Sequence, residues 1–173
     1  MGACSVDIPT IVVSGGAMLT GKYQGHDIAT SDVWRFSEAQ RAGRMTEEEM
    51  NIAEACMSRS RGHCAVMGTA STMAVMAEAL GLTLPENAAI PAADSRRKVL
   101  AHMSGIRIVD MVRKDLRLSD VLTKEAFENA IITNAAIGGS TNFIIHLLAI
   151  AGRIGVDLTI DDFDTSAKGI PLL

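Results

Sequence analysis

A short β-branched run that ends in two glycines constrains the fold most. The run extends from Thr10 to Val13 and is followed directly by Ser14, Gly15 and Gly16. This pattern is typical of a buried strand that enters a tight turn, as in a parallel α/β sheet. Loops at the carboxyl ends of such strands commonly bind ligands, so the three turn residues are candidate binding residues. From this feature alone, a plain turn is the simpler interpretation.

A lone cysteine lies in a second turn of small residues. Cys64 precedes a run from Thr69 to Leu80 in which apolar residues repeat at helical spacing. The cysteine is therefore expected in a loop just before a helix N-terminus, where exposed N–H groups and the helix dipole favour a thiolate. A thiolate attacks electrophiles or binds iron or zinc. The alternative is an inert cysteine that packs as a small hydrophobic residue.

Charged residues near these segments have two interpretations each. Arg59 and Arg61 would help to keep the thiol deprotonated or bind an anionic substrate, or they are solvated loop charges. Arg96, Arg97 and Lys98 fall in the first turn of a predicted helix, where the dipole disfavours cations. They face an acidic partner or an anion, or they form a solvated face, which is the preferred interpretation.

Caps and apolar faces predict further helices. Thr46 and Glu49 fit a capping box, and Thr123 fits an N-cap. Asp94 is expected to cap a long helix that ends near Lys114. The apolar side of that helix is marked by Val99, Met103, Ile106, Val109 and Val112. Residues 19–31, rich in glycine and polar groups, are predicted to form a loop, and the last five residues a short strand.

A glycine-rich turn precedes another predicted helix. Gly138 and Gly139 end one helix, and Ser140 and Thr141 begin the next. Such a turn at a helix N-terminus can hold an anion or a carboxylate, although it also serves as an ordinary cap. Thr69, at the start of the helix after Cys64, joins Ser140 and Thr141 as a candidate substrate-contacting residue.

Composition narrows the class of protein. The chain has 173 residues, which suggests one domain, and a net charge of −4 with 16 basic residues. This balance excludes the basic footprint of a nucleic-acid-binding protein. Cys4, Cys56 and Cys64 form no Cys-x-x-Cys pair, which indicates a reduced, cytoplasmic setting. No secretory signal and no uninterrupted membrane-spanning run is visible, so no membrane partner is expected.

Three separated motifs resemble the IlvD/Edd dehydratases, a family that includes dihydroxy-acid, 6-phosphogluconate and aldonic-acid dehydratases. The first motif lies in residues 58–84, with Gly62-His63-Cys64 and Thr69-Ala70-Ser71-Thr72-Met73. The second runs from Ala126 to Leu147 and contains Gly-Gly-Ser-Thr-Asn. The third joins Ile8-Pro9-Thr10 to Ser14-Gly15-Gly16. The resemblance covers the whole chain and implies an α/β fold, with a mostly parallel sheet flanked by helices.

The resemblance also implies a chemistry. Members of the family remove water from a 2,3-dihydroxy acid and give a 2-oxo acid. They use an iron–sulfur cluster, 2Fe-2S or 4Fe-4S, as a Lewis acid, and Mg²⁺ to bind the substrate carboxylate and 2-hydroxyl. Cys64 falls on a cluster-ligand position of the family pattern. The expected partners are a small hydroxy acid and further copies of the full-length protein, as a dimer or tetramer.

Other family features fall outside these residues. Two further cluster cysteines are expected upstream of Met1, one of them in a Cys-Asp-Lys motif that also supplies an Mg²⁺ ligand. A C-terminal β-rich domain carries the serine thought to act as base. Cys4 and Cys56 match no ligand position. Residues 1–173 are therefore expected to be a truncated part of a single N-terminal domain, unable to assemble the site alone.

The loop after the cysteine indicates a subtype. Dihydroxy-acid dehydratases usually continue Cys-Gly-Gly-Met-Tyr-Thr, whereas Cys64 is followed by Ala-Val-Met-Gly-Thr. This departure is similar to the sugar-acid branch, which acts on arabinonate- or xylonate-like substrates. Two alternatives stay open: a dihydroxy-acid dehydratase of branched-chain amino-acid synthesis, and a non-catalytic truncated domain.

Overall fold

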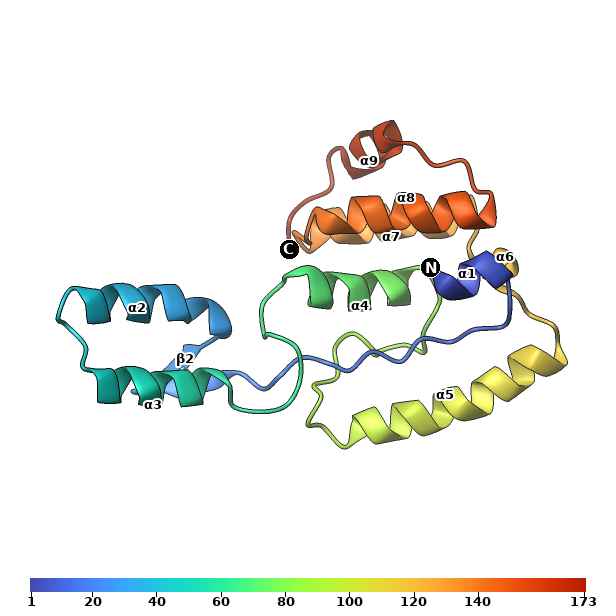
Figure 1. Ribbon diagram of the computed structural model, residues 1–173. Coiled ribbons are helices and arrows are strands. Elements are labelled where there is room, and N and C mark those ends of the chain that lie inside the picture. The colour runs from blue at the N-terminus through green and yellow to red at the C-terminus, as the bar shows by residue number, and fades with distance from the viewer.

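The structure, a computed structural model, describes residues 1–173 and is mainly helical (Figure 1). One 3₁₀ turn, η1 (Thr30–Asp32), precedes the second helix. The helices are α1 (Gly2–Val6), α2 (Val33–Arg41), α3 (Glu47–Met57), α4 (Thr69–Ala79), α5 (Arg96–Arg113), α6 (Leu118–Val121), α7 (Lys124–Ala136), α8 (Asn142–Ile154) and α9 (Ile160–Ala167). The strands are β1 (Gly21–Tyr23) and β2 (His26–Ile28).

Local sequence signals place several of these helices. The predicted capping box starts α3, because the Thr46 hydroxyl accepts a hydrogen bond from the Glu49 N–H at 3.2 Å and the Glu49 carboxylate accepts from the Thr46 N–H at 2.8 Å. These contacts hold the pKa of Glu49 below its ordinary value. Thr123 caps α7 as predicted, through its hydroxyl and the Ala126 N–H.

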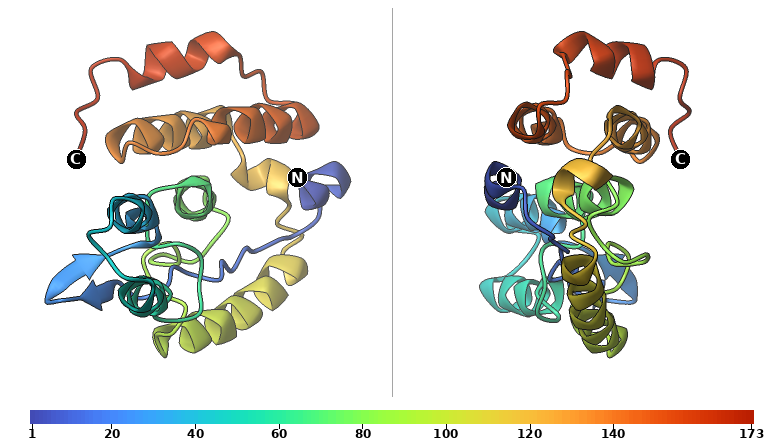
Figure 2. Two further views of the ribbon diagram at one scale, coloured as in Figure 1. Left: turned by 60° about the vertical axis from the view of Figure 1, so that its left-hand side comes forward. Right: turned by 90° about the vertical axis from the view of Figure 1, so that its right-hand side faces the viewer.

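The main core lies between the helices of the C-terminal half and α4. In Figures 1 and 2, α7 and α8 form one layer, with α9 on one side of it and α4 on the other. Thirteen buried residues form this core, and the fully buried side chains among them include Met76, Phe127 and Leu147. The rings of Phe143 and Phe163 meet edge to face at 5.5 Å, which joins α8 to α9.

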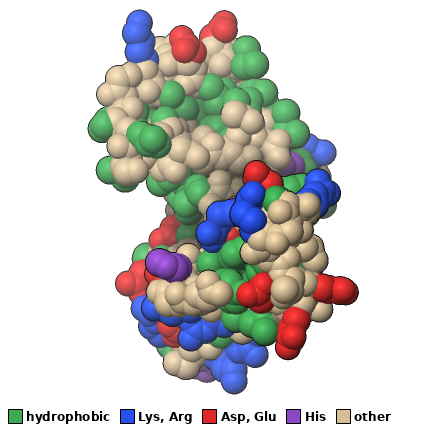
Figure 3. All heavy atoms as spheres, turned by 90° about the vertical axis from the view of Figure 1, so that its left-hand side faces the viewer, with side chains coloured by type: hydrophobic (Ala, Val, Ile, Leu, Met, Phe, Trp, Pro, Cys, Tyr) green, Lys and Arg blue, Asp and Glu red, His purple; other side chains and the backbone are tan.

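The helices α2 and α3, together with the β1–β2 hairpin, form a projecting arm (Figure 1). Its small core contains four buried residues, Ile28, Phe36, Ala53 and Met57. Figure 3 looks along the molecule from the side of this arm and shows the C-terminal helices as a separate upper lobe, with many hydrophobic side chains on its surface.

The predicted parallel sheet is not confirmed. Its expected strand, residues 10–13, is extended but unpaired with any other strand: the Val12 N–H donates to the Leu82 carbonyl at 2.7 Å, in a loop. A single parallel bridge joins Ala17 to His63. The sheet that forms is the antiparallel β1–β2 pair, inside residues predicted to be a loop. The C-terminal strand is absent too, although the Leu173 N–H donates to the Ala136 carbonyl.

The hairpin was missed because its turn is built from an unusual pair. Gln24 and Gly25 have φ angles of 48° and 82°, the two positive values that a type I′ turn requires. Asparagine or aspartate is the common residue at the first of these positions, so Gln-Gly gives a weaker sequence signal.

The long helix α5 differs from expectation in the face that it buries. Its apolar stripe is at the surface, with exposed fractions between 48% and 63%. The opposite face packs inward through Leu100, Ser104 and Met111, together with Arg97. In Figures 1 and 2, α5 lies on the far side of the extended N-terminal segment from α7 and α8, so those helices do not cover the stripe.

None of the helices combines the length and the apolar character that crossing a membrane requires.

Candidate functional site

The loop that carries Cys64 is fixed by backbone hydrogen bonds to the Ser14–Gly16 turn. The His63 N–H donates to the Gly16 carbonyl at 3.1 Å, and the Met18 N–H donates to the His63 carbonyl at 2.8 Å. Cys64 itself is half-buried, and its carbonyl lies 3.1 Å from Nδ1 of His63. Two candidate elements that are almost fifty positions apart in the sequence therefore lie side by side.

Both segments of this contact require glycine. A Cβ atom on Gly16 would lie 2.6 Å from the Ile90 carbonyl oxygen, and a Cβ on Gly62 would lie 2.4 Å from the Met18 nitrogen. The φ angles are +87° and +129°, in the region that L-residues rarely adopt. Close neighbouring atoms thus explain both glycines: the loop of Ile90 and Ala92 lies against Gly16, and the backbone of Ala17 and Met18 lies against Gly62.

A second group of contacts forms where the N-termini of α4 and α8 meet. Thr69 Oγ1 and Ser140 Oγ are 3.3 Å apart, and the Asn142 side chain donates to Thr69 Oγ1 at 2.8 Å. The Ser140 N–H donates to Thr72 Oγ1 at 2.9 Å, which locks the glycine turn onto α4. The structure thus brings Thr69 and Ser140 together, while Thr141 serves as the formal N-cap of α8 without a side-chain capping bond.

The hydroxyl pair of Thr69 and Ser140 has one proton free to donate. Asn142 supplies donors to both oxygens: its N–H to Ser140 Oγ at 3.3 Å and its side-chain amide to Thr69 Oγ1. One hydroxyl proton joins the two oxygens, and the other meets no protein acceptor. A free donor beside two helix N-termini is suited to an anionic group such as a carboxylate.

Along the chain, Cys64 lies between the residue that contacts the Ser14–Gly16 turn and the residue that contacts Ser140. It follows His63, which pairs with the Ser14–Gly16 turn, and it precedes Thr69 by five positions. The connecting segment is tied to α4, because the Ser71 hydroxyl donates to the Val66 carbonyl at 2.9 Å. Cys64 therefore lies along the chain between the two candidate ligand-binding loops, and the segments on both sides of it are fixed by hydrogen bonds.

The two arginines before Cys64 bind backbone carbonyls. Arg59 Nη1 donates to the Thr20 carbonyl at 2.9 Å, and Arg61 Nε donates to the Ala92 carbonyl at 3.1 Å. Each side chain therefore connects the Cys64 segment to a neighbouring loop.

The remaining cysteines lie elsewhere. Cys4 is buried in the main core, and Cys56 is half-buried on α3. No three His, Cys, Asp or Glu side chains gather closely enough to hold a metal ion. The donor set of these residues does not fit a complete iron–sulfur site, whereas Cys64, in a half-buried loop, fits a single ligand of a site completed by other donors.

Three residues of the site were not predicted. Asn87 is fully buried, and its Oδ1 accepts from the Ser14 N–H at 3.1 Å. Arg97 is buried, so the solvated-face interpretation is wrong for it. A cation in the first turn of a helix was the available signal for Arg97. Asn142 was visible as part of the Gly-Gly-Ser-Thr-Asn run, but its contact with Thr69 spans 73 positions.

Comparison with known proteins agrees with this arrangement of motifs. The family model described as the N-terminal region of dihydroxy-acid and 6-phosphogluconate dehydratases matches residues 1–173. The chain is 59% identical to an L-arabinonate dehydratase of Rhizobium leguminosarum and 60% identical to an L-arabonate dehydratase of Azospirillum brasilense, over its whole length and 30% of theirs. It is 45% identical to a dihydroxy-acid dehydratase of Methanococcus maripaludis, over 99% of the chain and 31% of that protein.

The chain spans less than a third of the length of these relatives. The match nevertheless includes every loop of the candidate site, from the Ser14–Gly16 turn to Thr141. The chain therefore belongs to the dihydroxy-acid and 6-phosphogluconate dehydratase family, within its N-terminal region.

Proposed function

We propose that these residues form part of a hydro-lyase that dehydrates a 2,3-dihydroxy acid of the sugar-acid type to a 2-oxo acid. The placement of Cys64 supports the proposal, because this cysteine lies along the chain between two candidate ligand-binding loops. One loop offers backbone groups at Ser14–Gly16, and the other offers the hydroxyls of Thr69 and Ser140.

The substrate class is supported by the balance of similarities. The two relatives named arabinonate or arabonate dehydratases are 59% and 60% identical to the chain, whereas the relatives named dihydroxy-acid dehydratases are 43% to 45% identical. The loop after Cys64 also departs from the pattern usual in dihydroxy-acid dehydratases. Both observations favour an aldonic acid as the substrate.

The residues of this chain would bind and orient the acid. The free hydroxyl proton of the Thr69–Ser140 pair would donate to the substrate carboxylate, beside the N-termini of α4 and α8. Cys64 would provide one thiolate ligand to an iron–sulfur cluster. Bound with one open iron, such a cluster supplies a Lewis acid for the departing hydroxyl, and Mg²⁺ supplies charge neutralisation. We also infer that the Ala17–His63 bridge extends into a parallel sheet in the longer polypeptide.

Substitution of Cys64 tests this proposal. In the full-length protein that contains these residues, we expect Cys64→Ser to abolish the visible absorbance of the cluster and the formation of 2-oxo acid. Cys56→Ser, which changes a half-buried thiol on α3, is the matched control and is expected to retain both. A Cys64→Ser protein with full absorbance and activity would rule out the ligand role.

A substrate panel separates the sugar-acid proposal from its alternative, a dihydroxy-acid dehydratase of branched-chain amino-acid synthesis. Turnover of five-carbon aldonates at higher kcat/KM than 2,3-dihydroxy-3-methyl acids is the expected result. The reverse order would favour the alternative, and no turnover of either class would favour a non-catalytic domain.

A further inference from the structure

Arg97 is a buried cation without a carboxylate partner. It lies in the first turn of α5 and is 9% exposed, whereas the neighbouring Arg96 side chain is 62% exposed and pairs with Asp94 at 2.8 Å. Burial lowers the pKa of Arg97 from its ordinary value. A buried guanidinium at the positive end of a helix is costly, so its retention calls for a specific use.

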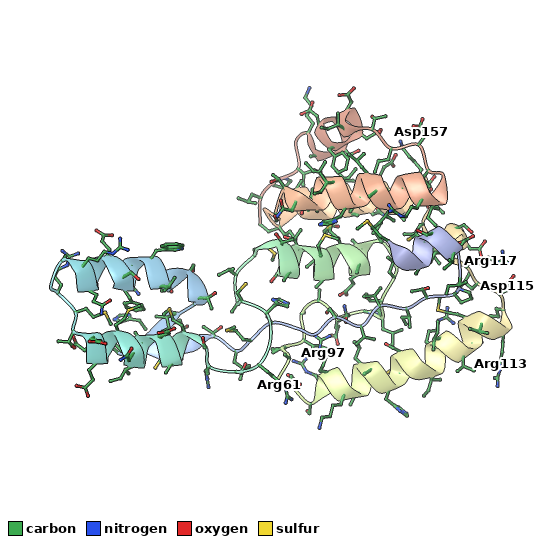
Figure 4. All side chains as sticks on the ribbon, in the orientation of Figure 1. Arg61, Arg97, Arg113, Asp115, Arg117 and Asp157 are labelled. Carbon is green, nitrogen blue, oxygen red and sulfur yellow. The ribbon has the colours of Figure 1, made fainter.

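Its hydrogen bonds converge on one loop. Nη1 donates to Asn87 Oδ1 at 3.0 Å, and Nη2 donates to the Asn87 carbonyl at 2.9 Å and to the Ile90 carbonyl. The planar guanidinium thus binds three oxygens of residues 87–90 at once, which a lysine ammonium on its flexible stem does less well. Figure 4 shows Arg97 reaching from the start of α5 toward the extended N-terminal segment.

The same loop holds the Ser14–Gly16 turn. Asn87 Oδ1 accepts both from Arg97 and from the Ser14 N–H, while its Nδ2 is buried without any partner. A Cβ on Gly16 would lie 2.7 Å from Nη2 of Arg97, so the turn rests directly against the guanidinium. The Ala92 N–H adds a bond to the Ala17 carbonyl at 2.8 Å.

The turn in turn holds the cysteine loop, through the bonds between Gly16, Met18 and His63. A continuous set of contacts therefore runs from Arg97 through Asn87 and the Ser14–Gly16 turn to Cys64. Every member of this set is buried or half-buried except Gly15.

We propose that Arg97 and Asn87 are positioning residues that fix the Ser14–Gly16 turn and, through it, the Cys64 loop. The function of the two residues is to hold the thiol and the turn at a constant separation. This inference rests on the proposed function only in treating Cys64 as a site residue.

Differential cysteine labelling tests the role without any cofactor. Trypsin leaves Cys4, Cys56 and Cys64 on three different peptides, because basic residues such as Lys22, Arg59 and Arg61 separate them. The metal-free protein is treated with iodoacetamide, and each peptide is quantified by mass spectrometry. Cys4, buried in the main core, reports global unfolding, so the ratio of Cys64 to Cys4 labelling reports release of the loop alone.

In Arg97→Met we expect that ratio to rise about tenfold, as the loss of charge-assisted hydrogen bonds frees the loop locally. Arg97→Lys is expected to lie between Arg97→Met and the unaltered protein. Arg96→Met, on the adjacent exposed arginine, is the matched control and should leave the ratio unchanged.

Two substitutions of Asn87, both close to it in size, provide a second test. Asn87→Asp keeps the acceptor oxygen and gives Arg97 a counter-charge, so we expect an unchanged ratio. Asn87→Leu removes the acceptor and is expected to raise the ratio as Arg97→Met does. In the iron-loaded full-length protein, the same two disruptive variants should lose cluster absorbance.

Equal labelling of Cys64 in all variants, or a joint rise of Cys4 and Cys64 in both Arg97→Met and Asn87→Leu, would overturn the positioning role. If the unaltered full-length protein binds no iron, the proposed function fails, while the labelling ratio still decides the role of Arg97 and Asn87.

Discussion

Two helices with clear apolar stripes have opposite surroundings. On α8 the stripe is buried against α1, α4 and α9, and Phe143, Leu147 and Ala151 are at most 4% exposed. On α5 the stripe is at the surface, and Ile106 at its centre is 63% exposed. Helical periodicity predicts that a face is apolar, but it does not say which element covers that face. On α5, a polar contact set around Arg97 and two apolar residues, Leu100 and Met111, form the buried side instead.

The largest expected effect is on the covered stripe. Leu147 is fully buried in the main core, so Leu147→Ala removes apolar contacts and leaves a cavity. We expect it to lower the free energy of unfolding by about 3 kcal/mol or more, measured by urea denaturation. A loss below about 1 kcal/mol would mean that the core relaxes around the cavity, and the contrast between the helices would weaken.

A smaller loss is expected on the inner face of α5. Leu100 is 6% exposed and lies beside loop residues such as Leu84 and Ile90, outside the main helical core. Leu100→Ala should cost about 2 kcal/mol in the same denaturation experiment, at the low end for a buried leucine. A cost equal to that of Leu147→Ala would show that the loops pack as firmly as the helical core.

The exposed stripe is expected to be nearly neutral. Ile106→Ala removes a side chain that is mostly in water already and replaces it with a better helix former. The free energy of unfolding should change by less than about 0.5 kcal/mol. A loss comparable to that of Leu100→Ala would mean that this face is covered in solution.

The smallest effect concerns the exposed charges of α5. Asp110 accepts from Lys114 at 3.1 Å and from Arg107 at 2.7 Å, and the hydrogen bond from Lys114, followed by the charges of both cations, keeps its pKa below the ordinary value. A depressed pKa stabilises the fold above the unfolded-state pKa and loses that contribution as the pH falls through the folded-state value.

Asp110→Asn should therefore be slightly less stable than the unaltered protein at pH 7 and equal to it in strong acid. Thermal unfolding at a series of pH values measures the difference. A gap that persists in strong acid would assign the effect to packing instead of charge.

Local signals predicted the helices well. The capping box of Thr46 and Glu49, the Thr123 cap and the run after Cys64 lie within a few residues of the helices that they start, so a single sequence contains the information. Residues 10–13 have strand-forming side chains, yet a strand also needs a partner. The backbone of Val12 finds a loop carbonyl instead.

The site was predicted in its parts but not in its assembly. Ser14–Gly16, Cys64, Thr69 and Ser140 were each recognisable by residue type. Their proximity depends on contacts such as Thr69 with Ser140, 71 positions apart, which no local pattern encodes. Arg97 was misjudged for the same reason, since its acceptors lie in a separate loop.

The bridge between Ala17 and His63 has a topological consequence. It joins the chain just before the arm to the chain just after it, so the two connections to the arm lie side by side. Residues 19–61 are thus an excursion whose two ends already touch, as in an inserted module. A short glycine linker in place of residues 21–57 would retain Arg59 and Arg61 and keep the Cys64 loop bonded to Gly16. The arm can therefore vary in length or shape without changing the contact between the Cys64 loop and the Ser14–Gly16 turn.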